Sequence, residues 1–145
     1  MFFGAVVAPA AFGVLRSFGL TNASEIAGSI VTRTLGVINV AGFAIALLLL
    51  VTAFLRRTAQ SRMSLIIECV CISLVALTTA LGHWWIAARM RAIRAALELP
   101  IDQIAVTDPR RIEFNVLHGY SVKALGVAMI AGLVALVFIG RSVRH

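Results

Sequence analysis

Long apolar runs that end at arginines constrain this chain more than any other feature. One run extends from Thr34 to Leu55 and stops at Arg56, and another lies between Arg62 and Arg89. A helix needs roughly 20 residues to cross a hydrocarbon core of about 30 Å, and both runs reach that length. Because lipid offers no hydrogen bonds to the backbone, only helices and closed barrels span it. The runs therefore predict membrane-spanning helices.

The composition supports this interpretation. Hydrophobic residues make up 61% of the 145 residues and charged residues 13%, whereas soluble domains have about half and about a quarter. The net charge of +7 does not indicate a nucleic-acid partner, because the arginines lie at the ends of apolar runs and no basic stripe alternates with exposed aromatics. We expect an integral membrane protein whose partner is the lipid bilayer and which binds no nucleic acid.

The expected fold class is all-α, an integral membrane four-helix bundle that forms a single domain over residues 1–145. The four spans are expected at about residues 1–18, 34–55, 63–88 and 112–140. The first apolar run offers only about fourteen residues, or roughly 21 Å of helix. We therefore expect a first helix that is short or truncated. Pro9 lies within it and predicts a helix bend.

Two local signals add detail to the second and third spans. Asn22 and Glu25 have the spacing of a capping box, which predicts that a helix begins there, ahead of the second span. Trp84 and Trp85, at the end of the third span, are typical of the aromatic belt at a membrane surface. The tight connection between Arg56 and Arg62 defines one face of the membrane, which we call the turn side; the opposite face is the loop side.

Polar side chains of three spans reach a similar depth near the loop side. At about 1.5 Å of rise per residue from the turn-side arginines, His83 lies roughly 31 Å away, His118 roughly 34 Å and Asn39 roughly 25 Å. On a helical wheel, one stripe of the last span carries His118 and Ser121 and is expected to face other helices. That stripe comprises Phe114, His118, Ser121, Leu125, Ala128 and Gly132. We expect a polar pocket formed by His118, Ser121, His83 and Asn39.

The same count of helix rise separates two charges that could otherwise pair. Glu68 lies about 9 Å from the turn-side end of its span, whereas Lys123 lies about 27 Å from the turn-side end of the last span. Glu68 is therefore expected beside the turn-side arginines. Arginines flank both faces, so their distribution does not decide the orientation; the short basic turn favours a cytoplasmic turn side.

The two histidines, His83 and His118, lie at one depth and could have any of three roles. They can be hydrogen-bonding anchors in the helix interface, members of a functional polar pocket, or the ligands of a haem iron. No carboxylate or cysteine completes a transition-metal set, and Cys69 and Cys71 point about 200° apart on a helix. We expect no metal and no cofactor; the alternative is a b-type haem redox module that uses His83 and His118. No nucleophile–base pair, phosphate loop or cofactor motif indicates an enzyme.

Short motifs along almost the whole chain resemble one family. The motifs are Phe3-Gly4, Ala8-Pro9-Ala10-Ala11-Phe12, Ala27-Gly28, and Phe114 with Leu117-His118 and Ser121. They resemble the transmembrane protein 205-like family of small four-helix membrane domains. This resemblance implies the fold and membrane residence rather than an activity. Two differences are that family members carry about a further half helix before Phe-Gly, and an asparagine where this chain has Lys123 and Ala124.

Taken together, these features predict a non-enzymatic polytopic protein of a bacterial-type inner membrane. We expect it to act as an accessory subunit or as a small-solute transport or resistance component. A chain this small with a short first helix is expected to form a homo-oligomer or to join a larger membrane complex.

Overall fold

The computed structural model describes residues 8–20, 22–58 and 61–142. Its elements are α1 (Ala8–Ser17), α2 (Ala23–Leu55), α3 (Arg62–Ala80), the π-helical segment η2 (Leu81–Ile86), α4 (Ala87–Ala95) and α5 (Pro109–Ser142). Of these, α3, η2 and α4 follow one another directly and form a single helix from Arg62 to Ala95. No strand occurs among these residues, which confirms the all-α prediction.

Three helices are long and apolar enough to cross a membrane, namely Ala23–Leu55, Arg62–Ala95 and Pro109–Arg141. Each is about 50 Å long at 1.5 Å per residue and so exceeds a hydrocarbon core of about 30 Å. The prediction of a membrane protein is confirmed. The predicted count of four spans is not matched, because α1 has only 10 residues and the beginning of the expected first span, residues 1–7, lies outside the described part of the chain.

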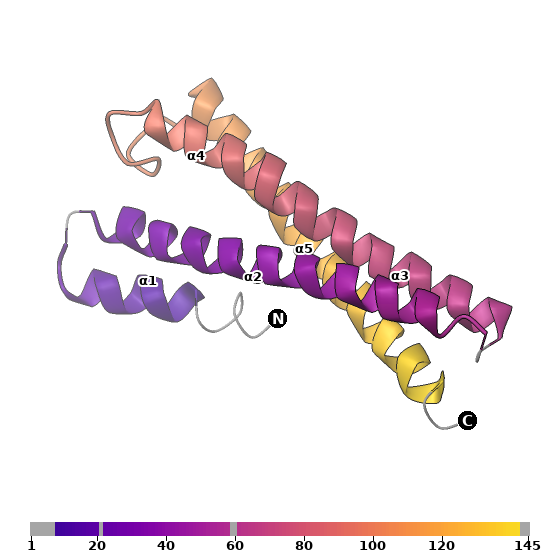
Figure 1. The fold of residues 1–145 in the computed structure, drawn as a ribbon. Coiled ribbons are helices and arrows are strands. Elements are labelled where there is room, and N and C mark those ends of the chain that lie inside the picture. Colours follow the sequence, from indigo (N-terminus) through magenta and orange to yellow (C-terminus); the bar gives the residue numbers. More distant parts are fainter. Residues whose placement is uncertain (1–7, 21, 59–60, 143–145) are drawn as a thin grey trace.

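The central helix of the bundle is α3. It packs against both α2 and α5, whereas α2 and α5 make few contacts with each other. Figure 1 shows α2 beside α3 at the turn side, separating from α4 toward the other end, while α5 crosses behind. The short helix α1 packs on α2 and joins it through Gly19, which has a φ of +66°. Only glycine adopts such a backbone conformation without strain.

An apolar cluster of mostly small residues holds the three long helices together. It consists of Ala46 from α2, Ile72 and Ala76 from α3, and Ala135 from α5. Lipid tails are as apolar as these side chains, so association in a membrane depends on close packing rather than on the hydrophobic effect. Alanine methyl groups let the helix backbones approach closely enough for that packing.

The buried face of α5 differs from the predicted stripe. Its buried and half-buried positions include Phe114, Leu117, Ser121, Ala124, Ala128, Ala131 and Ala135. Steps of three and four residues alternate along this set, which is the 3.5-residue period of left-handed helix packing. The predicted stripe passed through His118 instead of Leu117. His118 lies about a quarter turn away from the buried face and is exposed.

An ion pair closes the hairpin between α2 and α3. Glu68 is 0% exposed, and its Oε1 lies 3.0 Å from Nη2 of Arg56, whose side chain is 35% exposed. The expectation that Glu68 lies beside turn-side arginines rather than near Lys123 is confirmed. A buried carboxylate requires a compensating charge, so this contact fixes the register of the two helices at the turn side.

The helix starts agree only in part with the sequence signals. Asn22 is the N-cap of α2 as predicted, but its side chain makes no capping hydrogen bond; its backbone oxygen accepts from the N–H groups of Glu25 and Ile26. Pro9 lies in the first turn of α1, where a helix needs no backbone donor. The segment that would show a bend at Pro9 precedes residue 8, outside the described residues.

The apolar cluster gives a direct test of packing. Ala46 is 1% exposed, so Ala46→Leu overfills the contact between α2 and α3 and should lower the free energy of unfolding by about 1–3 kcal/mol. Denaturant unfolding in detergent micelles measures this value. The matched control is Ala44→Leu at an exposed position of the same helix, which should leave stability unchanged. Equal stability of the two variants would contradict the packing.

Asp108 gives a test by pH at the start of α5. Its carboxylate accepts from Nη2 of Arg110 at 2.9 Å and from the Arg110 backbone N–H at 2.8 Å. The side-chain hydrogen bond, followed by the backbone one, lowers the pKa of Asp108. The carboxylate therefore stabilises the fold fully above its unfolded pKa of about 3.9 and loses this effect as pH falls through the lower folded pKa. An NMR titration of the carboxyl carbon should give a midpoint below the ordinary value, and Arg110→Ala should raise it. An unchanged midpoint in Arg110→Ala would exclude this cause.

Candidate functional site

The contact between α2 and the Arg62–Ala95 helix contains a row of glycines that face polar side chains. A Cβ atom placed on these glycines would lie 3.0 Å from Arg94 Nη2 at Gly28, 3.8 Å from His83 Nδ1 at Gly36, 3.3 Å from Thr79 Cγ2 at Gly42 and 3.3 Å from Asn39 Nδ2 at Gly82. We call the residues Gly28, Thr32, Gly36, Asn39, Gly42, Thr79, Gly82, His83 and Arg94 the polar seam. Each missing side chain makes room for a polar one from the opposite helix, a pattern typical of membrane helix interfaces.

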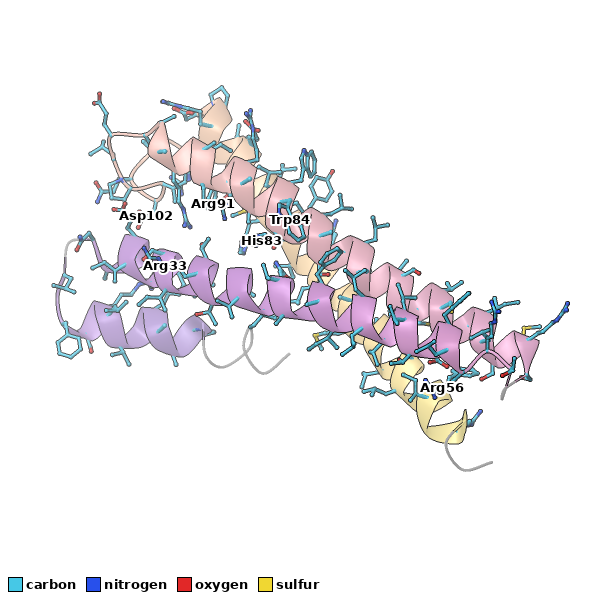
Figure 2. The ribbon with its side chains drawn as sticks, in the orientation of Figure 1. Arg33, Arg56, His83, Trp84, Arg91 and Asp102 are labelled. Carbon is cyan, nitrogen blue, oxygen red and sulfur yellow. The ribbon has the colours of Figure 1, made fainter. Side chains whose placement is uncertain are left out.

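A π-helical turn lies in the middle of the seam. The backbone N–H of Ala87 donates to the carbonyl of Gly82, five residues earlier. Such turns occur mostly as single bulges in α-helices and are frequent at functional sites. Gly82 is buried against Asn39, so the turn occurs where the two backbones approach closely. Figure 2 places His83 on the side of this turn that faces α2.

The imidazole of His83 carries an unpartnered atom. Its Nδ1 is buried and has no hydrogen-bond partner among the described residues. The ring packs edge-on against Trp84, with 5.0 Å between the ring centroids and 85° between the planes. A buried polar atom without a partner costs about 1–3 kcal/mol, and in most proteins such an atom binds ordered water. His83 Nδ1 is therefore a candidate binding atom.

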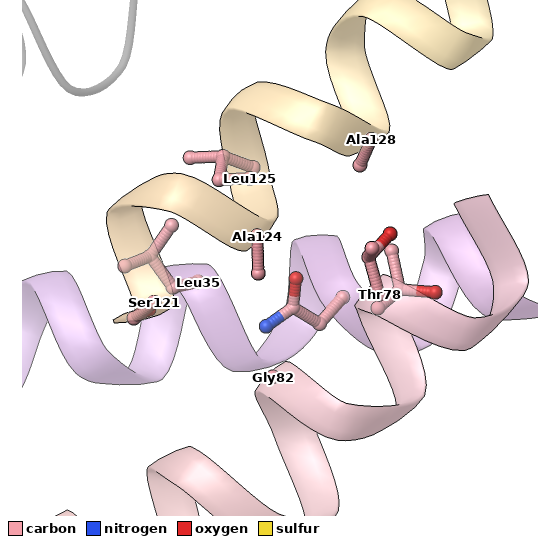
Figure 3. Close-up of a pocket in the computed structure, with 9 residues that line it drawn as sticks. Leu35, Thr78, Gly82, Ser121, Ala124, Leu125 and Ala128 are labelled. Atoms are coloured by element: carbon pink, nitrogen blue, oxygen red, sulfur yellow. The ribbon is translucent and has the colours of Figure 1, made fainter. Parts of the chain in front are cut away.

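A small cavity lies next to this turn, where α2, α3 and α5 converge (Figure 3). Its lining comprises Leu35, Asn39, Thr78, Thr79, Gly82, Ser121, Ala124, Leu125 and Ala128. The space open to the centre of a water-sized sphere is about 20 Å³. One water molecule needs roughly 10–15 Å³ on this measure, so the cavity holds about one water or a solute of similar size.

The polar groups of the lining differ in what they can still bind. The hydroxyls of Thr78 and Thr79 donate to the carbonyls of Leu74 and Val75, each at 2.7 Å, and so offer only oxygen lone pairs. The Asn39 amide makes no hydrogen bond within the part of the chain that the structure describes, and neither does the Ser121 hydroxyl. Both groups can donate and accept, so the cavity can hold a guest that does either.

The predicted pocket residues divide into two groups. Asn39 and Ser121 line the cavity, and His83 follows the lining residue Gly82. His118 is exposed on α5 and is not among the lining residues. The sequence analysis missed Thr78, Thr79 and Gly82. The two adjacent threonines could have indicated the cavity, because they are polar residues within an apolar span.

The described residues contain no group of three or more histidine, cysteine or acidic side chains that could hold a metal ion. Cys69 and Cys71 are free thiols. The haem alternative has no support in this geometry, because His83 and His118 do not share the cavity and its space of about 20 Å³ is much smaller than a porphyrin.

At the loop-side end of the seam, Arg94 connects three helices. Its Nη1 donates to Oγ1 of Thr32 at 3.2 Å, and its guanidinium carbon lies 4.9 Å from the ring centroid of Phe114. The Thr32 hydroxyl itself donates to the carbonyl of Gly28 at 2.7 Å, which leaves its oxygen free to accept. The sequence analysis did not include Arg94 in the predicted pocket. The structure shows it joining α4 to α2 and α5, where α2 and α4 separate.

Three spanning-length helices around a polar seam define an all-α polytopic membrane protein. The chain belongs to the family described as Domain of unknown function (DUF4149), whose family model matches residues 1–98. The match includes α1, α2, α3, η2 and α4, and hence the whole polar seam, but ends before α5 and Ser121. No curated protein and no solved structure matches the chain. The family match does not confirm the resemblance to the transmembrane protein 205-like family.

The contacts of Arg94 predict a local effect on α4. Arg94→Ala removes a charged hydrogen bond, worth about 1.5 kcal/mol, and should accelerate amide hydrogen exchange in α4 by about tenfold. Hydrogen exchange measured by mass spectrometry in detergent micelles tests this. Arg91→Ala is the matched control, because Arg91 is exposed on the same helix and should leave exchange unchanged. Similar exchange in both variants would show that Arg94 does not hold α4 in place.

Proposed function

We propose that this protein is a non-enzymatic membrane protein that transports a small solute, and that the solute binds at the polar seam and its cavity. One observation supports this most strongly. The Asn39 amide and the Ser121 hydroxyl, which make no hydrogen bonds in the described structure, line one small cavity from two different helices, and the buried, unpartnered Nδ1 of His83 belongs to the residue that follows the lining residue Gly82. Polar groups within spanning helices are costly, and they commonly mark solute pathways.

The size of the cavity limits the solute. A space of about 20 Å³ admits about one water molecule, so the site suits solutes near that size and excludes drug-sized molecules. A resistance role would then depend on movement of a small ion or neutral solute. The resemblance to the transmembrane protein 205-like family supports the membrane location, which we propose to be a bacterial-type inner membrane.

A second candidate role is that of an accessory subunit, either in a homo-oligomer or in a larger membrane complex. Only 11% of the most apolar window of α2 is buried within the chain, compared with 28% for the Arg62–Ala95 helix. The outer face of α2 is therefore available to another protein as well as to lipid. In this role the polar seam would serve to fix the helix register.

Flux into proteoliposomes tests the transport function. Vesicles with the purified protein should take up at least one of water, urea, glycerol, ammonium or protons faster than empty vesicles, as followed by light scattering and by an enclosed pH dye. Asn39→Leu replaces the amide by an apolar group of similar size and should slow this flux by about tenfold, equivalent to about 1.4 kcal/mol.

Asn115→Leu is the matched control, because Asn115 is exposed on α5 and does not line the cavity. Its flux should equal that of the unchanged protein. If no member of the solute panel enters faster than into empty vesicles, the transport function is wrong and the subunit role is favoured.

A further inference from the structure

We infer that the transported solute is the proton, and that the polar seam leads it from the loop side to His83. This inference rests on the proposed transport function and adds the identity of the solute to it. It depends on three features: the spacing of polar groups along the seam, the unpartnered Nδ1 of His83, and the apolar cluster that follows on the turn side.

The first feature is the regular spacing of the seam. Thr32, Asn39 and the glycines that face His83 and Thr79 occur every three or four residues along α2. Successive positions are therefore about 4.5–6 Å apart along the helix axis. A water molecule hydrogen-bonded to both sides bridges about this distance. The seam thus offers a series of polar positions from the loop side inward, spaced about one water molecule apart.

The second feature is the chemistry of His83. Neutral imidazole has one ring nitrogen that can accept a proton and one that donates. Nδ1 can accept a proton from a hydronium ion of the seam, which leaves a neutral water molecule, and the imidazolium ion returns one proton to another water on release. One N–H bond forms and later breaks, and no other reactant is required. The cavity beside Gly82 has space for about one such water.

The surroundings of His83 contain few groups that could compete for this proton. The ring packs on Trp84 and Gly36. The titratable side chains on the surrounding elements are Glu25 and Arg33 on α2, Arg62, Glu68, Cys69 and Cys71 on α3, Arg89, Arg91 and Arg94 on α4, and Arg110, Arg111, Glu113, His118, Tyr120, Lys123 and Arg141 on α5. Of these, Arg89 pairs with Glu113 at 2.6 Å, and Arg94 bonds to Thr32.

The third feature is a dry stretch on the turn side of the seam. From Thr79 to Glu68 the distance along α3 is roughly 16 Å. This stretch contains the apolar cluster, in which Ile72 is 1% exposed. Apolar constrictions block passage by excluding water. Glu68, paired with Arg56, is the next proton-binding group beyond it. The cluster should therefore be the main barrier, and proton movement should be slow compared with that through an open pore.

Proton uptake by proteoliposomes tests the inference. An enclosed pH dye reports acidification while a potassium gradient with valinomycin sets the membrane potential. The unchanged protein should acidify the vesicles faster than the background of empty vesicles, and His83→Gln should lower the rate about tenfold, to near that background. His118→Gln is the matched control, since His118 is exposed outside the lining, and should retain the full rate.

The barrier is tested separately by Ile72→Ser, which should raise the proton rate several-fold because the smaller, hydroxyl-bearing side chain leaves space for water and gives it a hydrogen-bond partner. An unchanged rate would show that the apolar cluster is not the barrier.

All variants are compared only when size-exclusion chromatography shows a single species. If His83→Gln fails to fold, Thr79→Val replaces it, with the same expected loss of rate.

The outcomes separate this inference from the function on which it rests. Full proton uptake in His83→Gln, or in the Thr79→Val variant that replaces it, overturns the inference. Flux of another solute of the panel without proton uptake overturns the inference and leaves the transport function standing. Absence of any flux overturns both.

Discussion

Close approach of α2 and α3 is the constraint on which the rest of the structure depends. In lipid, apolar side chains gain little by leaving the solvent for each other, so helices associate through packing and polar contacts. Ala46 and Ala76 provide the packing in the turn-side half, and the glycines of the polar seam provide it in the loop-side half. The same missing side chains that allow this approach also admit Asn39, Thr79 and His83 into the interface.

The two halves of the interface therefore differ in character for a common reason. Where alanines meet Ile72, the contact is filled and dry. Where glycines meet polar side chains, the contact retains a cavity and an unpartnered nitrogen. The π-turn at Gly82 falls within the second half, where the α-helical hydrogen bonds widen beside Asn39. The apolar packing of the interface lies in the first half, and the polar groups that could serve function lie in the second.

Much of the scaffold could be predicted from the sequence, because apolar length and flanking arginines determine what can cross a membrane. The all-α class and the place of Glu68 followed from such rules, and the start of α2 followed from the spacing of Asn22 and Glu25. The site could be predicted only in part. Depth along a helix brought Asn39, His83 and His118 to a similar level, but depth does not specify direction. Both the predicted stripe and the observed buried set pass through Phe114 and Ser121, and spacing alone does not decide whether Leu117 or His118 between them faces the bundle. The π-turn follows no simple periodicity.

The contact between Arg56 and Glu68 also has a consequence for how the chain enters the bilayer. A carboxylate within a spanning segment opposes insertion unless a counter-charge accompanies it. Because the partner lies at the end of the preceding helix, α2 and α3 form a neutralised hairpin as soon as both have been synthesised. That hairpin can partition into lipid during translation, before α5 leaves the ribosome, and so provides the template on which the last helix docks.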